Sequence, residues 1–180
     1  SLQYTVTGNG ANYGILSGGG VLNQLSINSN TISSVQWSSL NANRFLLANT
    51  SLVNNTTLIQ NNVLSGVTSS INATAGFYGI YNAVAASLAQ LNVSGNTIQN
   101  LELSSSSGPV LLLSSSGTQS AGVNISANTI RNYTISSSGS GDITGISNAS
   151  ASASLITVNS NTLSDAVLAH STGSICDIYN

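Results

Sequence analysis

The chain has 180 residues and a mass of 18.2 kDa, which is enough for one ordinary domain. Only 3% of its residues are charged, against about 25% in an average globular protein. Its two basic residues, Arg44 and Arg131, are too few to neutralise a phosphate backbone, so we expect no nucleic-acid partner. Because 41% of the residues are hydrophobic, we expect an ordered chain even though Ser, Thr and Asn are abundant.

The apolar residues are spread along the chain and are not gathered into one long segment. No apolar run approaches the roughly 18 residues that span a bilayer, so no membrane span is expected. The first residues lack the charged region and apolar core of a signal peptide, and we interpret the chain as a mature segment. The scarcity of Lys, the absence of Met and the many Ser, Thr and Asn residues favour an extracellular or cell-surface location.

One short motif recurs five times: an aliphatic residue, Asn three positions later and another aliphatic residue two positions after the Asn. The motif Asn residues are Asn30, Asn62, Asn96, Asn128 and Asn161. They are separated by 32, 34, 32 and 33 residues, so the period is about 33 residues. A fixed period of this length is typical of solenoids and other repeat architectures.

The remaining elements follow the same period in chain order. Apolar segments precede the motifs by about half a period, at 13–16, 45–47, 77–81, 110–113, 143–146 and 175–179. Their β-branched and aromatic residues predict short strands. Gly- and Ser-rich clusters predict the breaks between strands, at 18–20, 104–108, 114–117 and 136–141. The Ala-rich segment 83–91 fits either a strand or a short helix.

These patterns predict one coil of a solenoid per repeat. Residues 1–180 would then form a single segment of about five to six coils that belongs to a longer array. Stacked coils create parallel sheets with strands about 4.8 Å apart. Aliphatic residues at matching positions would form interior columns, and the motif Asn residues would form a ladder of hydrogen-bonded amides at a corner.

The motif residues also carry a resemblance. The triplets at 30–32, 96–98 and 128–130 read Asn-Thr-Ile, and the sequence Gly-Ile-Tyr-Asn occurs at 79–82. These segments resemble the repeats of right-handed parallel β-helix proteins, in particular Ser/Thr/Asn-rich surface proteins secreted by bacteria such as the Bacteroidetes. The resemblance implies an all-β, right-handed parallel β-helix, a fold that serves lyases, adhesins and fibres alike.

A leucine-rich solenoid is the alternative architecture. The segments 22–32 and 88–98 fit the leucine-rich-repeat pattern, with Leu at the first position. The other three repeats place Asn54, Ser120 and Ala153 there, and the period of about 33 residues exceeds the usual 20 to 29. The β-helix is therefore the preferred interpretation.

Few residues suggest chemistry. The four acidic residues, Glu102, Asp142, Asp165 and Asp177, fall at different positions of the repeat, and only Asp142 and Asp177 are roughly in phase. His170 is the only imidazole and has no second His or Cys at the spacing of metal ligands. We therefore predict no catalytic residue, no metal site and no cofactor, and we expect that the chain is not an enzyme.

Two surface features suggest binding. Thr31, Thr97, Thr129 and Thr162 follow the motif Asn residues and would form an outward row, interrupted by Val63, similar to the Thr ranks of ice-binding proteins. The aromatic rings of Tyr13, Tyr78 and Tyr81 could stack on sugars, although their segments also fit core strands.

The sequence favours a structural, non-catalytic extracellular solenoid that serves as a cell-surface stalk, an adhesin segment or a fibre. The alternatives are a glycan- or ice-binding module and a polysaccharide-active β-helix enzyme. Solenoids need polar or helical caps on their terminal coils, and we recognise none in the sequence. We therefore expect either further coils or end-to-end or lateral self-association, with glycans as the other candidate partner.

Overall fold

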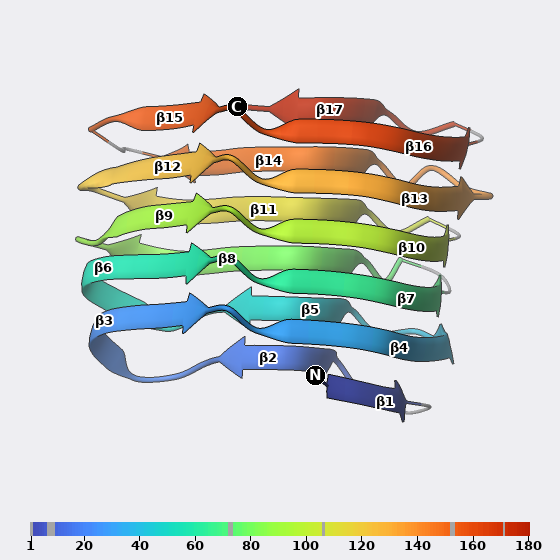
Figure 1. The fold of residues 1–180 in the computed structure, drawn as a ribbon, viewed down its shortest axis with the longest axis horizontal. Helices are drawn as coiled ribbons and strands as arrows, with labels where there is room; N and C mark the ends of the chain where they lie inside the picture. The colour runs from blue at the N-terminus through green and yellow to red at the C-terminus, as the bar shows by residue number, and fades with distance from the viewer. Residues whose placement is uncertain (1, 7–9, 72–73, 106, 152–153, 171) are drawn as a thin grey trace.

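The computed structural model describes residues 2–6, 10–71, 74–105, 107–151, 154–170 and 172–180. These residues form β-strands joined by short turns, and no helix occurs among them (Figure 1). Accordingly, the described part of the chain contains no helix long and apolar enough to cross a membrane.

The strands belong to three sheets that share one topology. Sheet A is formed by β1 (Leu2–Val6), β4 (Thr31–Leu40), β7 (Val63–Ile71), β10 (Thr97–Ser105), β13 (Thr129–Ser137) and β16 (Thr162–His170). Sheet B is formed by β2 (Asn12–Ser17), β5 (Arg44–Asn49), β8 (Phe77–Ser87), β11 (Val110–Gln119), β14 (Ile143–Ala151) and β17 (Ile175–Tyr179). Sheet C is formed by β3 (Val21–Asn28), β6 (Leu52–Gln60), β9 (Gln90–Ser94), β12 (Gly122–Ser126) and β15 (Ile156–Asn159).

Every pairing in these sheets is parallel and joins equivalent strands of successive coils. In sheet A, for example, Ile98 pairs with Leu64 of the preceding coil and with Ile130 of the following coil. The chain passes through the three sheets in turn and rises by one strand per circuit, as a right-handed coil (Figure 1). The predicted parallel β-solenoid of about 33 residues per coil is therefore confirmed.

Three expectations about local structure change. The segment 83–91, which the sequence left open between strand and helix, forms no helix: 83–87 end β8, 90–91 begin β9, and 88–89 connect the two strands. The predicted break at 114–117 is wrong, because these residues lie within β11 and pair with β8 and β14 on both sides. The leucine-rich solenoid does not describe the chain, since each interior coil contributes strands to three sheets.

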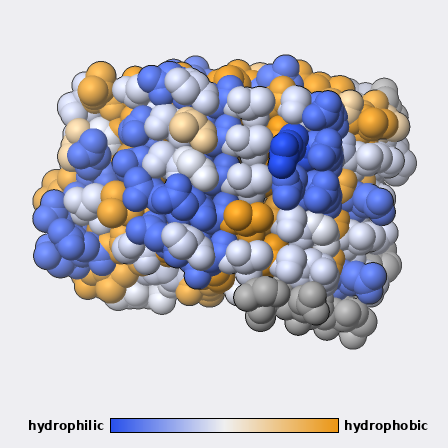
Figure 2. All heavy atoms as spheres, in the orientation of Figure 1, coloured by the Kyte–Doolittle hydropathy of each residue, from blue (hydrophilic) through white to orange (hydrophobic). Residues whose placement is uncertain are grey.

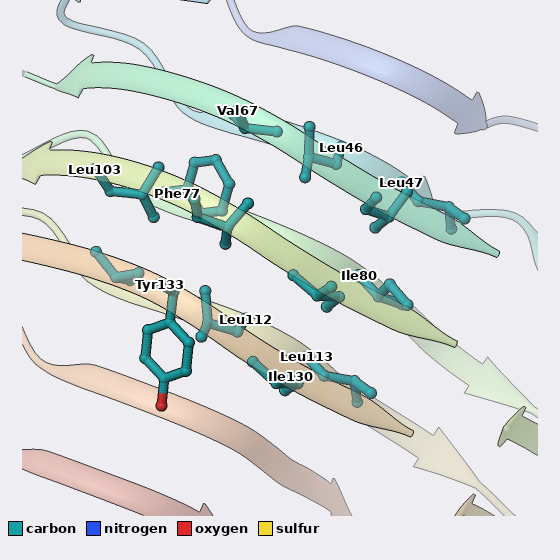
Figure 3. Packing of buried hydrophobic residues seen from close by; sticks show 14 of the residues in the cluster. Leu46, Leu47, Val67, Phe77, Ile80, Leu103, Leu112, Leu113, Ile130 and Tyr133 are labelled. Atoms are coloured by element: carbon teal, nitrogen blue, oxygen red, sulfur yellow. The ribbon is translucent and has the colours of Figure 1, made fainter. Parts of the chain in front are cut away.

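The core occupies the space between the three sheets and consists of aliphatic columns. The predicted column in sheet A contains Ile32, Leu64, Ile98, Ile130 and Leu163, and the predicted column in sheet C contains Ile27, Ile59, Val93, Ile125 and Val158. Leu47, Ile80 and Leu113 form a comparable column on sheet B, and their side chains point into the same interior (Figure 3). Burying each such side chain contributes about 1.5 to 3 kcal/mol.

A second interior column of sheet B alternates small and large residues. It contains Gly14, Leu46, Gly79, Leu112 and Gly145, and both leucines are fully buried. A Cβ atom at Gly79 would lie 2.3 Å from the carbonyl oxygen of Leu112, and one at Gly14 would lie 2.5 Å from that of Leu46. The glycines therefore leave room for the backbone of the next coil and for the side chains of Ile32 and Ile98, which lie opposite on sheet A.

We predict that Gly79→Ala lowers the free energy of unfolding by about 2 kcal/mol, because the added methyl group overpacks the interior against backbone. Gly10→Ala is the matched control, since a Cβ atom there meets no atom within 4 Å. Chemical denaturation of both variants measures the difference. Equal free energies of unfolding for the two variants would show that the backbone beside Gly79 moves to accommodate the methyl group, and the prediction would be wrong.

Candidate functional site

The motif Asn residues lie at the corner where the chain leaves sheet C and enters sheet A. The residue before each of them adopts a left-handed backbone conformation, with φ between 53° and 65°, at Ser29, Asn61, Gly95, Ala127 and Ser160. This conformation costs a non-glycine residue roughly 1 to 2 kcal/mol. The corner therefore depends on interactions that offset this strain.

The amide groups at this corner supply those interactions. Asn62 Nδ2 donates to Asn96 Oδ1 at 2.9 Å and to the carbonyl oxygen of Ile27 at 2.8 Å. The backbone nitrogen of Asn62 also donates to Asn96 Oδ1, at 3.0 Å. In return, Asn62 Oδ1 accepts from the backbone nitrogen and Nδ2 of Asn30, at 3.0 and 2.9 Å. Each interior amide thus uses both of its donors and accepts two hydrogen bonds.

The same contacts continue through the stack. Asn96 Nδ2 donates to Asn128 Oδ1 at 2.9 Å, and Asn128 Nδ2 donates to Asn161 Oδ1 at 3.0 Å. Asn62, Asn96 and Asn128 are buried, with exposures of 1% or less. The Asn ladder predicted from the sequence, from Asn30 to Asn161, is therefore present and runs along the corner of every motif.

A second amide ladder, which the sequence analysis missed, lies in sheet B. Its aligned positions are occupied by Asn49, Asn82, Ser115, Asn148 and Asn180. Asn49 Nδ2 donates to Asn82 Oδ1 at 2.8 Å, and Asn148 Nδ2 donates to Asn180 Oδ1 at 2.7 Å. The signal that could have revealed this ladder is the recurrence of Asn at the same period of 32 to 33 residues.

Ser115 interrupts the second ladder. Its hydroxyl group pairs with that of Ser150, at 3.0 Å, and does not reach the amides of the neighbouring coils. As a result, the buried Asn82 Nδ2 and Asn148 Oδ1 atoms have no hydrogen-bond partner. A buried polar group left unpaired costs about 1 to 3 kcal/mol, so this coil is a weak point of the stack.

The predicted Thr row lies on the outer face of sheet A. Thr31, Val63, Thr97, Thr129 and Thr162 pair in register along the sheet. Their side chains are half-buried or exposed. Four residues after each ladder Asn, the backbone again becomes left-handed, at Ser34, Gly66, Asn100, Asn132 and Asp165. These irregularities divide the outer face of sheet A into two parts.

The second part of this face carries an open trough of about 590 Å³, with Trp37 and Leu103 also in its lining. Its outward side chains are hydroxyl, amide and carboxylate groups from Gln36, Thr68, Glu102 and Thr134 and from Ser38, Ser70, Ser104 and Ser136. Gln36, Thr68, Glu102 and Thr134 are paired in register, and the hydroxyls of Ser70 and Ser104 lie 3.0 Å apart. Figure 2 shows hydrophilic and intermediate side chains aligned in columns on the face that includes this sheet.

The acidic residues lie at different positions of the repeat, as expected, but the expected alignment of Asp142 with Asp177 is wrong. Glu102 and Asp165, which the repeat places in separate columns, both line a smaller hollow of about 300 Å³ beside the trough. Asp142 and Asp177 are not in phase, because Ile143 pairs with Ile175 and so aligns Asp142 with Ser174. The Asp142 carboxylate instead accepts a hydrogen bond from the backbone nitrogen of Ser174, at 2.9 Å.

Metal-binding side chains do not gather in the part of the chain that the structure describes. No group of three or more His, Cys, Asp or Glu side chains there could hold a metal ion. The side chain of His170, the only imidazole in the sequence, lies outside the described residues.

The aromatic residues form an outer stack on sheet B. Tyr13, Phe45 and Tyr78 are stacked in successive coils, with ring centroids 4.9 and 4.7 Å apart and planes within 11° of parallel. Tyr81 is tilted against the last two rings. Burial raises the pKa of the Tyr78 phenol, and the neighbouring Tyr81 adds to this effect. The rings contact one another and leave only Tyr13 substantially exposed, at 38%.

Known proteins add no relative to this description. No family matches the chain, and no match is found among curated proteins or among solved structures. The geometry of the ladders, the trough and the aromatic stack therefore carries the functional argument.

We predict that Asn96→Leu lowers the free energy of unfolding by about 3 kcal/mol, although leucine adds apolar area. The substitution leaves the backbone nitrogen of Asn62 without its acceptor. It also removes one donor from the Asn128 amide oxygen and the side-chain donor from the carbonyl oxygen of Ile59. Asn124→Leu is the control, because Asn124 is only half-buried and makes one side-chain hydrogen bond, to Asn92. Urea unfolding measures both, and a midpoint for Asn96→Leu equal to that of wild type would refute the importance of the ladder.

We predict that Ser115→Asn raises the free energy of unfolding by about 1 kcal/mol. An amide at position 115 would offer partners to Asn82 Nδ2 and Asn148 Oδ1 and would complete the second ladder. Ser116→Asn, on the neighbouring half-exposed residue, should leave the stability unchanged. Thermal and urea denaturation test the pair; a loss of stability for Ser115→Asn would mean that the coil cannot accommodate the amide.

Proposed function

We propose that this chain is a structural, non-catalytic segment of an extracellular or cell-surface protein, and that it acts as a stalk, adhesin segment or fibre element. The observation that carries the proposal is that the same contacts are repeated in successive coils. The buried amides, the interior aliphatic columns and the glycine positions all hold one coil on the next. In such a stack, hydrogen bonds between equivalent strands hold each coil in a fixed position relative to the next along the axis.

The composition supports a location outside the cell. Low charge and a surface rich in Ser, Thr and Asn are the features shared with the Ser/Thr/Asn-rich surface proteins of bacteria that the repeats resemble. The β-solenoid is the fold that this resemblance implies, and it is compatible with a stalk, although the same fold serves other functions as well.

Surface labelling tests this proposal. An antibody raised against the folded chain should stain intact cells of the source organism as strongly as permeabilised cells. Loss of the segment from its parent protein should reduce cell attachment or surface assembly without removing an enzymatic activity. Staining that requires permeabilisation would show that the extracellular assignment is wrong.

Glycan binding is the second candidate, and the trough of sheet A is the observation that favours it. Its two rows of hydroxyl, amide and carboxylate groups repeat from coil to coil and could hydrogen-bond the hydroxyl groups of an extended polysaccharide. Groups that converge on a concave surface are the usual feature of a ligand site.

We predict that a neutral oligosaccharide recognised by this trough binds about tenfold more weakly to Thr68→Val, which keeps the shape of the side chain and removes its hydroxyl group. Thr31→Val is the matched control, because Thr31 lies on the same sheet but outside the trough. Calorimetry with cello-, xylo- and manno-oligosaccharides measures the affinities. Absence of binding across this panel, or equal losses in both variants, would remove this candidate.

A further inference from the structure

The trough on sheet A carries a single charged group, and its charge is negative. Glu102 is the only charged residue among the described residues that line the trough; the others are Ser, Thr, Gln, Trp and Leu. Its side chain is exposed, and the register of the sheet places it between Thr68 and Thr134, which are exposed as well. Because parallel strands lie about 4.8 Å apart, the carboxylate has a hydroxyl-bearing residue one strand away on each side.

The arginines of the chain lie elsewhere. The sequence contains no lysine, and its two arginines are Arg44 and Arg131. Arg44 is fully buried at the start of β5, in sheet B. Arg131 lies on sheet A but outside the trough, and its Nε donates a hydrogen bond to Gln99 Oε1 at 2.9 Å. The lining of the trough therefore offers the Glu102 carboxylate no arginine or lysine as a counter-charge.

A second carboxylate lies beside the trough. Asp165 lines the smaller hollow together with Glu102, so the two concave surfaces share the Glu102 side chain. The Asp165 carboxylate accepts a hydrogen bond from Ser164 Oγ at 3.0 Å, which leaves it negatively charged. A concave surface lined by charges of one sign attracts ligands of the opposite sign. The preferred ligand of the trough is therefore a cation.

The hydroxyl groups around Glu102 indicate what kind of cation fits. Ser70, Ser104 and Ser136 form an exposed row beside the row that contains Glu102, and the hydroxyls of Ser70 and Ser104 lie 3.0 Å apart. A lysine-rich peptide would meet the carboxylate with an ammonium group, but the methylene groups of its side chain have nothing to exchange with these hydroxyls. A sugar that carries an amino group offers an ammonium and several hydroxyls on one ring.

We propose that the trough binds polysaccharides with free amino groups, such as β-1,4-linked glucosamine, more tightly than neutral chains of the same linkage. This inference rests on the proposed glycan-binding function of the trough. The ammonium group of one sugar pairs with Glu102, and hydroxyl groups of the chain hydrogen-bond with Thr68 and Thr134. Hydrogen bonds between charged groups are roughly twice as strong as those between neutral groups, so the ammonium group decides between chains of the same shape.

Three β-1,4-linked oligosaccharides of equal length test the proposal by calorimetry on the whole chain. Their sugars are glucosamine, N-acetylglucosamine and glucose, which differ only in the group at the second carbon. At low ionic strength and mildly acidic pH, where the amino groups are protonated, we expect the glucosamine chain to bind about fivefold more tightly than either neutral chain. Added salt should reduce this preference, because ions screen exposed charges.

Two variants assign the preference to one side chain. Glu102→Gln removes the charge and keeps the shape, so it should abolish the preference for glucosamine. Asp142→Asn is the matched control, because Asp142 lies outside the trough and the asparagine retains an oxygen that can accept from Ser174. This variant should keep the preference. A preference that survives in Glu102→Gln would overturn the proposal.

The remaining outcomes separate this inference from glycan binding itself. Equal affinities of the wild-type chain for the glucosamine and glucose oligosaccharides would overturn the inference and leave glycan binding in place. Absence of binding to all three oligosaccharides would remove both. A lysine-rich peptide of similar charge that binds as tightly as the glucosamine chain would show that the trough attracts any cation, and the assignment to amino sugars would be wrong.

Discussion

A buried primary amide that is repeated once per coil is the constraint on which the rest of the solenoid depends. Each interior ladder Asn donates to a backbone carbonyl of the preceding coil and to the amide oxygen of the following coil. It does so at a corner where residues such as Ala127 adopt a left-handed conformation that is unfavourable for them. The amide contacts therefore fix both the direction of the turn and the registration of one coil on the next.

The parallel register of the three sheets follows from this corner. Once Asn62, Asn96 and Asn128 are aligned, the strands that enter and leave the corner are aligned as well, and the aliphatic residues fall into columns without further adjustment. A slip of one residue would turn every interior side chain outward and would separate the amides at the same time. The ladder and the core therefore both disfavour a shift in the register of the strands.

The fold could be predicted because its determinants recur. The Asn motif and the aliphatic positions around Ile98 appear once per coil, so their period alone indicates the columns and the first ladder. Features that depend on a single residue could not be predicted in this way. The break at Ser115 and the buried guanidinium of Arg44 occur once each, and their meaning depends on which atoms of other coils lie beside them.

Surface features were harder to predict from the sequence than the core, because they depend on how neighbouring coils stack. The trough lies next to a left-handed residue in each coil, such as Asn100 or Asn132. The recurrence of Gly, Asn or Asp four positions after most motif Asn residues was a sequence signal for these positions, because such residues adopt that conformation most readily. The hollow itself depends on how the strands stack, which the period does not show. Glu102 and Asp165 line one hollow although their repeat positions differ. Likewise, Tyr13, Phe45 and Tyr78 stack on one another outside the central core cluster, where Phe45 is buried by its neighbours and Tyr13 is exposed.

The alternation of Gly14, Leu46, Gly79, Leu112 and Gly145 divides the coils into two kinds. Coils with glycine and coils with leucine at this position alternate, so the repeat of this column is a pair of coils of 65 to 66 residues. Removing one coil would place Leu46 against Leu112 or bring two glycines together, whereas removing a pair would leave every contact of the column intact. A protein built in this way should gain or lose length in even numbers of coils during its evolution.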